Sequence, residues 1–170
     1  MRHEKVCLCP QTLGRRAGVI VSKERAVRDP VTNKRTVPDL KISNAHLGAV
    51  HIDVSIVGAF SKSNIHAKEH GMRQRASEKN KQHSAGAAAE CATFIPFVVD
   101  SIGRFTPEAW RVIDLIVGAD LAQSATGDQH TQPELTRMNI ARAVAIQLQA
   151  GNATIDLEGL SSQGIPFHPF

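Results

Sequence analysis

Two segments in the first third of the chain alternate hydrophobic and polar residues. Residues 37–43 and 49–57 are rich in Val and Ile, and a polar turn at residues 43–48 joins them. Alternation with a period of two is typical of a half-buried β-strand, and the short connection is typical of a hairpin. The pattern therefore predicts two paired strands, with a shorter strand at residues 19–24 before them.

Helical segments and one more strand follow the predicted hairpin. Residues 73–90 are rich in Ala, Glu, Lys and Arg, which favour a helix, whereas residues 94–99 form an apolar run that is typical of a buried strand. Pro96 places this strand at a sheet edge or at the start of its pairing, because proline cannot donate to the ladder. A further helix is expected to start at Thr106-Pro107, since Thr caps helices and Pro suits the first turn.

Apolar residues at helical spacing predict a final helix, which Gly151-Asn152 is expected to end. A short helix is also expected within residues 2–16. The order of these elements predicts an α/β fold with a mixed central sheet of about four strands, flanked by helices and followed by an extra C-terminal helix. We expect one domain over residues 1–153 and a poorly ordered tail over residues 154–170. The residues that mark this final helix are Leu135, Met138, Ala141, Ala145 and Leu148.

The composition is that of an ordinary globular protein with one domain. Of its 170 residues, 42% are hydrophobic and 21% are charged. No apolar run approaches the about 20 residues of a membrane span, and the N-terminus lacks the apolar core of a signal peptide. Three cysteines cannot all pair in disulfides, and the spacing of Cys7 and Cys9 does not match a zinc finger. We therefore expect an intracellular protein.

Charge is distributed unevenly along the chain. Residues 1–83 contain 16 Lys or Arg and 7 Asp or Glu, whereas residues 84–170 contain 4 and 9. A basic segment of this kind suits a polyanionic partner such as nucleic acid, although a solvated basic face is the common alternative. The residues expected to contact nucleic acid are Arg15, Arg16, Lys34, Arg35, Lys41 and Lys81.

Each strand of the predicted hairpin carries one carboxylate, Asp39 on the first and Asp53 on the second. An acid within a strand lowers β propensity and is costly to desolvate. Two such acids on neighbouring strands suggest a shared role, of which holding a divalent cation is the commonest. The alternative is that both acids face water on the polar side of the sheet. Glu24, at the end of the first strand, is a possible third oxygen ligand.

Phosphodiester hydrolysis also needs a cationic side chain that stabilises the developing negative charge. The usual position, two residues after the second acid, is Ser55 here. The nearest candidates lie on the following helix, at Lys79 and Lys81, with His83 on the same helix face as Lys79. A lysine that reaches back from this helix can fill the same space as a strand lysine. The alternative for Lys79 is a solvated helix residue.

Together these segments resemble the PD-(D/E)XK restriction-endonuclease-like family. The motif residues are Pro38-Asp39, then Ile52-Asp53-Val54-Ser55, then the helical string Glu78-Lys79-Asn80-Lys81-Gln82-His83. They are most similar to the variant at the C-terminal end of site-specific non-LTR retrotransposon proteins, in which the lysine is displaced onto the helix. Residues 94–104 also resemble the Phe-x-Pro-Phe-x-Val-Glu-x-x-Gly segment of that variant. The resemblance covers about residues 2–153 in order.

The resemblance implies a metal-dependent DNA endonuclease of retrotransposon-derived type with a restriction-endonuclease-like core. Asp39 and Asp53 would be ligands of Mg²⁺ or Mn²⁺, Glu24 would be a supporting ligand, and Lys79 would be the displaced catalytic lysine. The partner would be DNA, at a nuclear location, with no membrane and no small-molecule cofactor.

Two departures from the family pattern leave other functions open. Val37 precedes Pro-Asp where the family has a basic residue, and Gln82-His83 replaces Lys-Tyr. The first alternative is a catalytically inactive endonuclease-like fold that binds nucleic acid. The second is a protein-interaction scaffold without affinity for nucleic acid.

Overall fold

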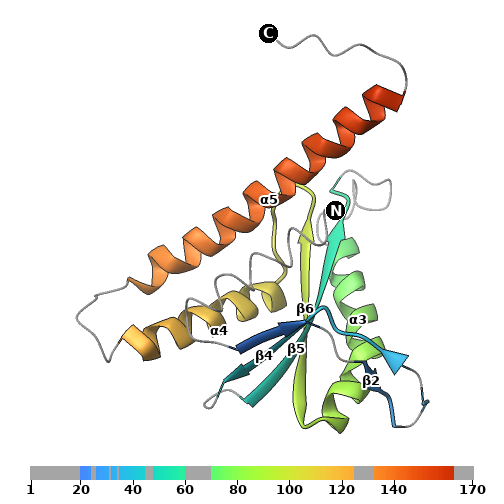
Figure 1. The fold of residues 1–170 in the computed structure, drawn as a ribbon, viewed down its shortest axis with the longest axis vertical. Helices are drawn as coiled ribbons and strands as arrows, with labels where there is room; N and C mark the ends of the chain where they lie inside the picture. Colours follow the sequence, from blue (N-terminus) through green and yellow to red (C-terminus); the bar gives the residue numbers. More distant parts are fainter. Residues whose placement is uncertain are drawn as a thin grey trace.

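The computed structural model describes residues 20–23, 26–30, 32–33, 35–44, 48–59, 70–124 and 132–162. A four-stranded mixed sheet forms its centre (Figure 1), with the strands in the order β1 (Ile20–Lys23), β4 (Leu40–Asn44), β5 (Gly48–Val57) and β6 (Ala92–Asp100). The first three strands pair antiparallel, and β5 and β6 pair parallel. The predicted α/β class and mixed sheet are therefore confirmed, as is the predicted hairpin.

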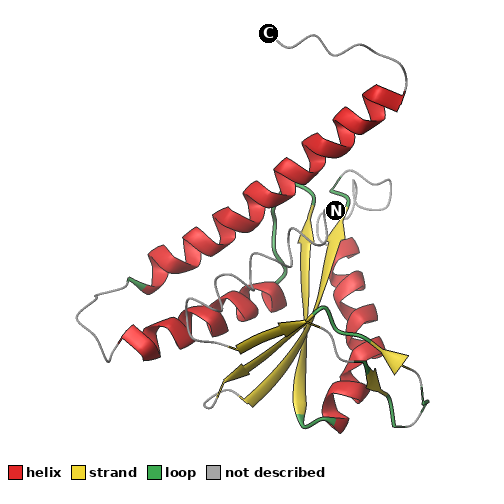
Figure 2. Cartoon of the chain, in the orientation of Figure 1, coloured by secondary structure: helices red, strands yellow, loops and turns green. Residues whose placement is uncertain are grey.

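Helices cover both faces of this sheet (Figure 2). Helix α3 (His70–Ala89) connects the parallel strands β5 and β6 and packs on one face, whereas α4 (Pro107–Ser124) packs on the other. Helix α5 (Pro133–Ser162) packs along α4 and extends past the sheet (Figure 1). A separate two-stranded ribbon is formed by β2 (Val27–Arg28) and β3 (Arg35–Thr36) beside α3. The predicted helix within residues 2–16 lies outside the described residues.

The two faces of β5 differ in chemistry because side chains alternate along a strand. Val50, Ile52 and Val54 point into the main core, where they meet β4, β6, α4 and α5. His51 and Asp53 belong to the opposite face, under α3. The side of β5 that meets α4 is therefore apolar, whereas its side under α3 carries polar residues beside a small apolar cluster of Met72, Ala76 and Val98.

Strand β6 lies at the edge of the sheet, as the position of Pro96 within it requires. The buried Asp100 carboxylate ends the strand by accepting hydrogen bonds from the N–H groups of Ile102 and Arg104. Gly103 has a φ of +92°, and a Cβ there would lie 3.2 Å from the Cβ of Ala145 on α5. This turn therefore needs glycine both for its backbone conformation and for its contact with α5.

Helix α4 starts where the sequence predicts, because the Ala109 N–H donates a hydrogen bond to Oγ1 of the buried Thr106 (3.3 Å). Helix α5 ends later than the sequence predicts. It continues through Gly151-Asn152 to Ser162, so the predicted helix end is wrong. No helix among the described residues is long and apolar enough to cross a membrane.

The apolar residues that mark α5 in the sequence do not all lie on its buried side. Leu135 and Met138 are 56% and 62% exposed, whereas Leu148 is buried and Ala141 packs on the core. Ile140 and Val144 are also buried, in the core cluster that includes α4 and the sheet. The fully buried positions recur every four residues and therefore lie along one side of the helix.

Candidate active site

Polar side chains occupy the contact between β5 and α3, where packed elements are ordinarily apolar. His51, Asp53 and Ser55 alternate along β5 and are 2%, 5% and 6% exposed. Helix α3 contributes Lys79 and His83, whose side chains are 14% and 5% exposed. We call these five residues the polar seam. Because α3 covers them, the alternative that Asp53 faces water does not hold.

Asp53 is the centre of the polar seam and faces two groups from α3. Lys79 Nζ lies 2.7 Å from Asp53 Oδ2, and His83 Nε2 lies 3.4 Å from Asp53 Oδ1. Lys79 and Asp53 therefore form a close ion pair. Lys79 and His83 reach the same carboxylate because residues four apart lie one above the other on a helix.

The His83 ring has a second contact that fixes its position. It stacks on Phe94 of β6, with the ring centroids 5.0 Å apart and the planes 15° from parallel. His83 is therefore held between the edge strand β6 and Asp53. The residue was noted in the sequence only for its position one turn after Lys79, so its contact with Asp53 is a finding of the structure.

Asp39 directly precedes β4, at a bend in the chain. Its side chain is half-buried, and its Oδ2 accepts a hydrogen bond from the N–H of Val54, the residue that follows Asp53 on β5 (2.7 Å). This hydrogen bond holds the Asp39 carboxylate at the backbone of β5, next to Asp53.

The donor set of this face can be compared with the needs of a divalent cation. Within the described ranges, no group of three or more His, Cys, Asp or Glu side chains is arranged to hold a metal ion. Mg²⁺, however, uses one or two protein carboxylates and completes its shell with waters and substrate phosphate oxygens. Asp39 and Asp53 fit that requirement, and the predicted ligand Glu24 lies outside the described residues.

A second charged cluster lies at the other end of the polar seam. Glu90 Oε2, just after α3, lies 3.1 Å from Lys41 Nζ and 3.3 Å from His51 Nε2. Burial lowers the pKa of His51, and the nearby Lys41 ammonium lowers it further, whereas Glu90 acts in the opposite direction. His51 was not predicted as a site residue from the sequence. Its position two residues before Asp53 could have indicated it, because alternate residues of a strand share a face.

The residues predicted to contact nucleic acid are only partly described. Arg35 and Lys81 are exposed and available to a polyanion. Lys41 is engaged with Glu90, while Arg15, Arg16 and Lys34 lie outside the described residues.

Lys79 is the sequence-predicted residue whose position matters most to the chemistry. It projects from α3 onto Asp53, so it brings a positive charge to the acid of β5. No protein-family model matches this chain, and no curated protein matches it either. The resemblance to restriction-endonuclease-like domains therefore rests on the sequence motifs alone.

Proposed function

We propose that this protein is a metal-dependent DNA endonuclease with a restriction-endonuclease-like site. The observation that supports this proposal most is the 2.7 Å contact between Lys79 Nζ and Asp53 Oδ2. Ser55 offers no charge at the usual lysine position, and α3 brings a cation to the same carboxylate by another route. The four-stranded mixed sheet, with Asp53 on β5 and Asp39 just before the neighbouring β4, is consistent with such a core.

Asp39 and Asp53 would hold Mg²⁺ or Mn²⁺ between β4 and β5. A cation bound there would lower the pKa of a coordinated water and neutralise charge on a phosphodiester. The Val54 N–H holds one oxygen of Asp39 in place beside β5. Lys79 and His83, both on α3, fix the orientation of the Asp53 carboxylate.

Lys79 would stabilise the negative charge that develops on the phosphate. When Asp53 shares its charge with a cation, its attraction for Lys79 weakens, and the ammonium group can turn toward a phosphate oxygen. The side chain is 14% exposed, so it is close enough to the surface to meet a substrate. Arg35 and Lys81 would add sequence-independent contacts to the DNA backbone.

Nicking of supercoiled plasmid DNA tests this function. The full chain should nick the plasmid in Mg²⁺ or Mn²⁺ and not in EDTA, and Asp53→Asn should abolish the nicking because it removes a ligand charge. Asp114→Asn is the matched control, since Asp114 is an exposed acid on α4 that pairs with Arg137. Metal-dependent nicking that survives in Asp53→Asn would contradict the proposed mechanism.

A catalytically inactive nucleic-acid-binding module is the second candidate. It is favoured by the observation that Lys79 and His83 already face both oxygens of Asp53, so the carboxylate is compensated without a metal ion. Such a module would bind DNA with an affinity that falls steeply with salt, would be indifferent to Mg²⁺ and to Asp39→Asn, and would nick no plasmid in any divalent metal.

A further inference from the structure

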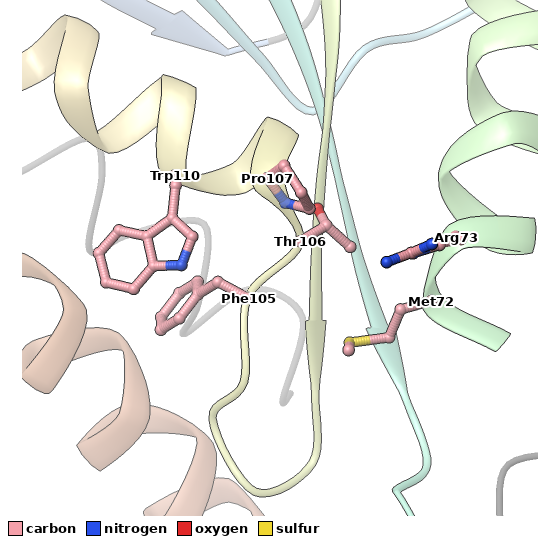
Figure 3. Close-up of a pocket in the computed structure, with 6 residues that line it drawn as sticks. All are labelled: Met72, Arg73, Phe105, Thr106, Pro107 and Trp110. Carbon is pink, nitrogen blue, oxygen red and sulfur yellow. The ribbon is translucent and has the colours of Figure 1, made fainter. Parts of the chain in front are cut away.

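A cavity of about 130 Å³ lies between the N-terminal ends of α3 and α4 (Figure 3). Figure 3 shows side chains from both helices and from the segment that leads into α4 around it. The residues that line it are Met72, Arg73, Phe105, Thr106, Pro107 and Trp110.

The walls of this cavity combine two kinds of chemistry. Phe105 and Trp110 are aromatic, with centroids 5.0 Å apart, and Met72 is a soft apolar side chain. Arg73 is the one charged residue of the lining, and its side chain is exposed. This lining suits a flat apolar group that carries a negative charge beside it.

The aromatic wall is already ordered without a ligand. Arg137 of α5 lies over the Trp110 ring at 4.6 Å, and Arg137 is itself held by Asp114 at 2.8 Å. Phe105 packs edge-on to the buried Phe97. A flat ligand would therefore meet a preformed surface and would not have to order these side chains on binding.

The cavity is close to the proposed cleavage site. Met72 and Lys79 lie on the same buried face of α3, with Ala76 between them. Seven residues along a helix correspond to about 10 Å. A stacked DNA strand rises about 3.4 Å per nucleotide, so this distance corresponds to about three nucleotides or fewer.

We propose that this cavity receives the base of an unpaired nucleotide within about three positions of the scissile phosphate. Arg73 holds the phosphate of that nucleotide, while Trp110, Phe105 and Met72 contact the base. A paired base is held in the duplex stack and cannot enter a cavity between two helices, whereas a bulged or single-stranded base enters at much lower cost. The proposal rests on the endonuclease function and adds a substrate preference, namely DNA with an unpaired nucleotide beside the cut.

Tryptophan fluorescence measures the binding of a base in the cavity directly, because Trp110 is the only tryptophan in the chain. The wild-type chain in EDTA is titrated with three DNA duplexes: one with a single bulged thymine, one with an abasic bulge, and one fully paired. The thymine bulge should quench the tryptophan and bind at least several-fold more tightly than the other two, since only it presents a base to stack.

Variants of α3 separate the cavity from the general basic surface. Arg73→Met should weaken binding of the bulged duplex by about tenfold, as the loss of one charged contact does. Arg75→Met is the matched control on the same helix, because Arg75 is exposed and pairs with Glu78. The Arg75→Met substitution should change the binding affinity only slightly, and by the same factor for all three duplexes.

The outcomes distinguish this proposal from the proposed function. Equal quenching by the thymine and abasic bulges, or equal losses in Arg73→Met and Arg75→Met, would overturn the cavity proposal while leaving the nicking result unaffected. Base-dependent quenching in a protein that nicks no plasmid would support the cavity and overturn the endonuclease function.

Discussion

Asp53 is the residue on which the proposed chemistry depends, and its surroundings are unusual for a strand carboxylate. It is 5% exposed, so its charge must be compensated within the protein. Lys79 and His83 provide that compensation from α3. A carboxylate held in this way is oriented before any metal or substrate arrives, which is what a catalytic ligand requires.

Asp39, Asp53 and Lys79 were singled out from the sequence, whereas His51 and the burial of Asp53 were not predicted. Alternation along the strands predicts that Asp39 and Asp53 share a face, and the structure shows the Asp39 carboxylate bound to the Val54 N–H, next to Asp53. The same alternation also fits a face that water covers, and only the position of α3 separates the two interpretations. A pattern with a period of two reports which residues share a face, not what lies above that face.

His51 gives rise to a prediction about stability and pH. Its pKa is lowered in the folded protein, so below the ordinary imidazole value of about 6.5 the unfolded chain binds the proton more readily. The folded state therefore loses stability as the pH falls through that region, and the effect is absent above it. His51→Gln removes this contribution, because Gln does not titrate.

The measurement is the free energy of unfolding in urea at about pH 7.5 and about pH 5.5. The decrease between the two pH values should be smaller in His51→Gln than in the wild type, while the other histidines contribute equally to both proteins. An equal decrease in both proteins would show that His51 is protonated as easily when folded as when unfolded.

At the scale of elements, the strands and helices follow the predicted pattern closely, whereas the packing of α5 does not. This helix has apolar residues on more than one side, so periodicity alone does not say which side meets α4. Ile140 and Val144 are buried, while Leu135, Met138 and Ile146 are exposed. Gly151 does not end the helix as predicted, because a glycine inside a helix lowers helix stability by only about 1 kcal/mol relative to alanine.

A matched pair of substitutions tests the packing of α5. Ile140 is 2% exposed and Ile146 is 57% exposed, and both lie on the same helix. Ile140→Ala should lower the free energy of unfolding by about 2–4 kcal/mol, because it leaves a cavity against α4. Ile146→Ala should change it by less than about 0.5 kcal/mol, as exposed substitutions do. Chemical denaturation of both variants measures the difference, and equal losses would show that the buried side of α5 is misplaced.

At the scale of the whole molecule, connectivity produces the site. A parallel pair of strands needs a crossover, and α3 is the crossover between β5 and β6. That connection lays α3 along β5 from Met72 near Val57 to Glu90 near His51, so its polar residues meet the strand carboxylate. The sequence predicted the helix and the strand separately, but their relative orientation depends on tertiary contacts. The cavity at the start of α3 was not predicted for the same reason, since its lining comes from two segments that are far apart in the sequence.

The central claim is that Lys79, reaching from α3, replaces the strand lysine of a restriction-endonuclease-like site. The most direct test is the single-turnover nicking rate of Lys79→Met compared with that of Lys81→Met, at saturating protein and in Mg²⁺. Lys79 contacts Asp53, whereas Lys81 is exposed on the same helix, so the pair separates chemistry from DNA binding. We predict that Lys79→Met lowers the rate by at least about 100-fold, the usual loss when one charge-stabilising group is removed, and that Lys81→Met leaves it within a few-fold. A Lys79→Met protein that nicks as fast as the wild type would contradict the claim.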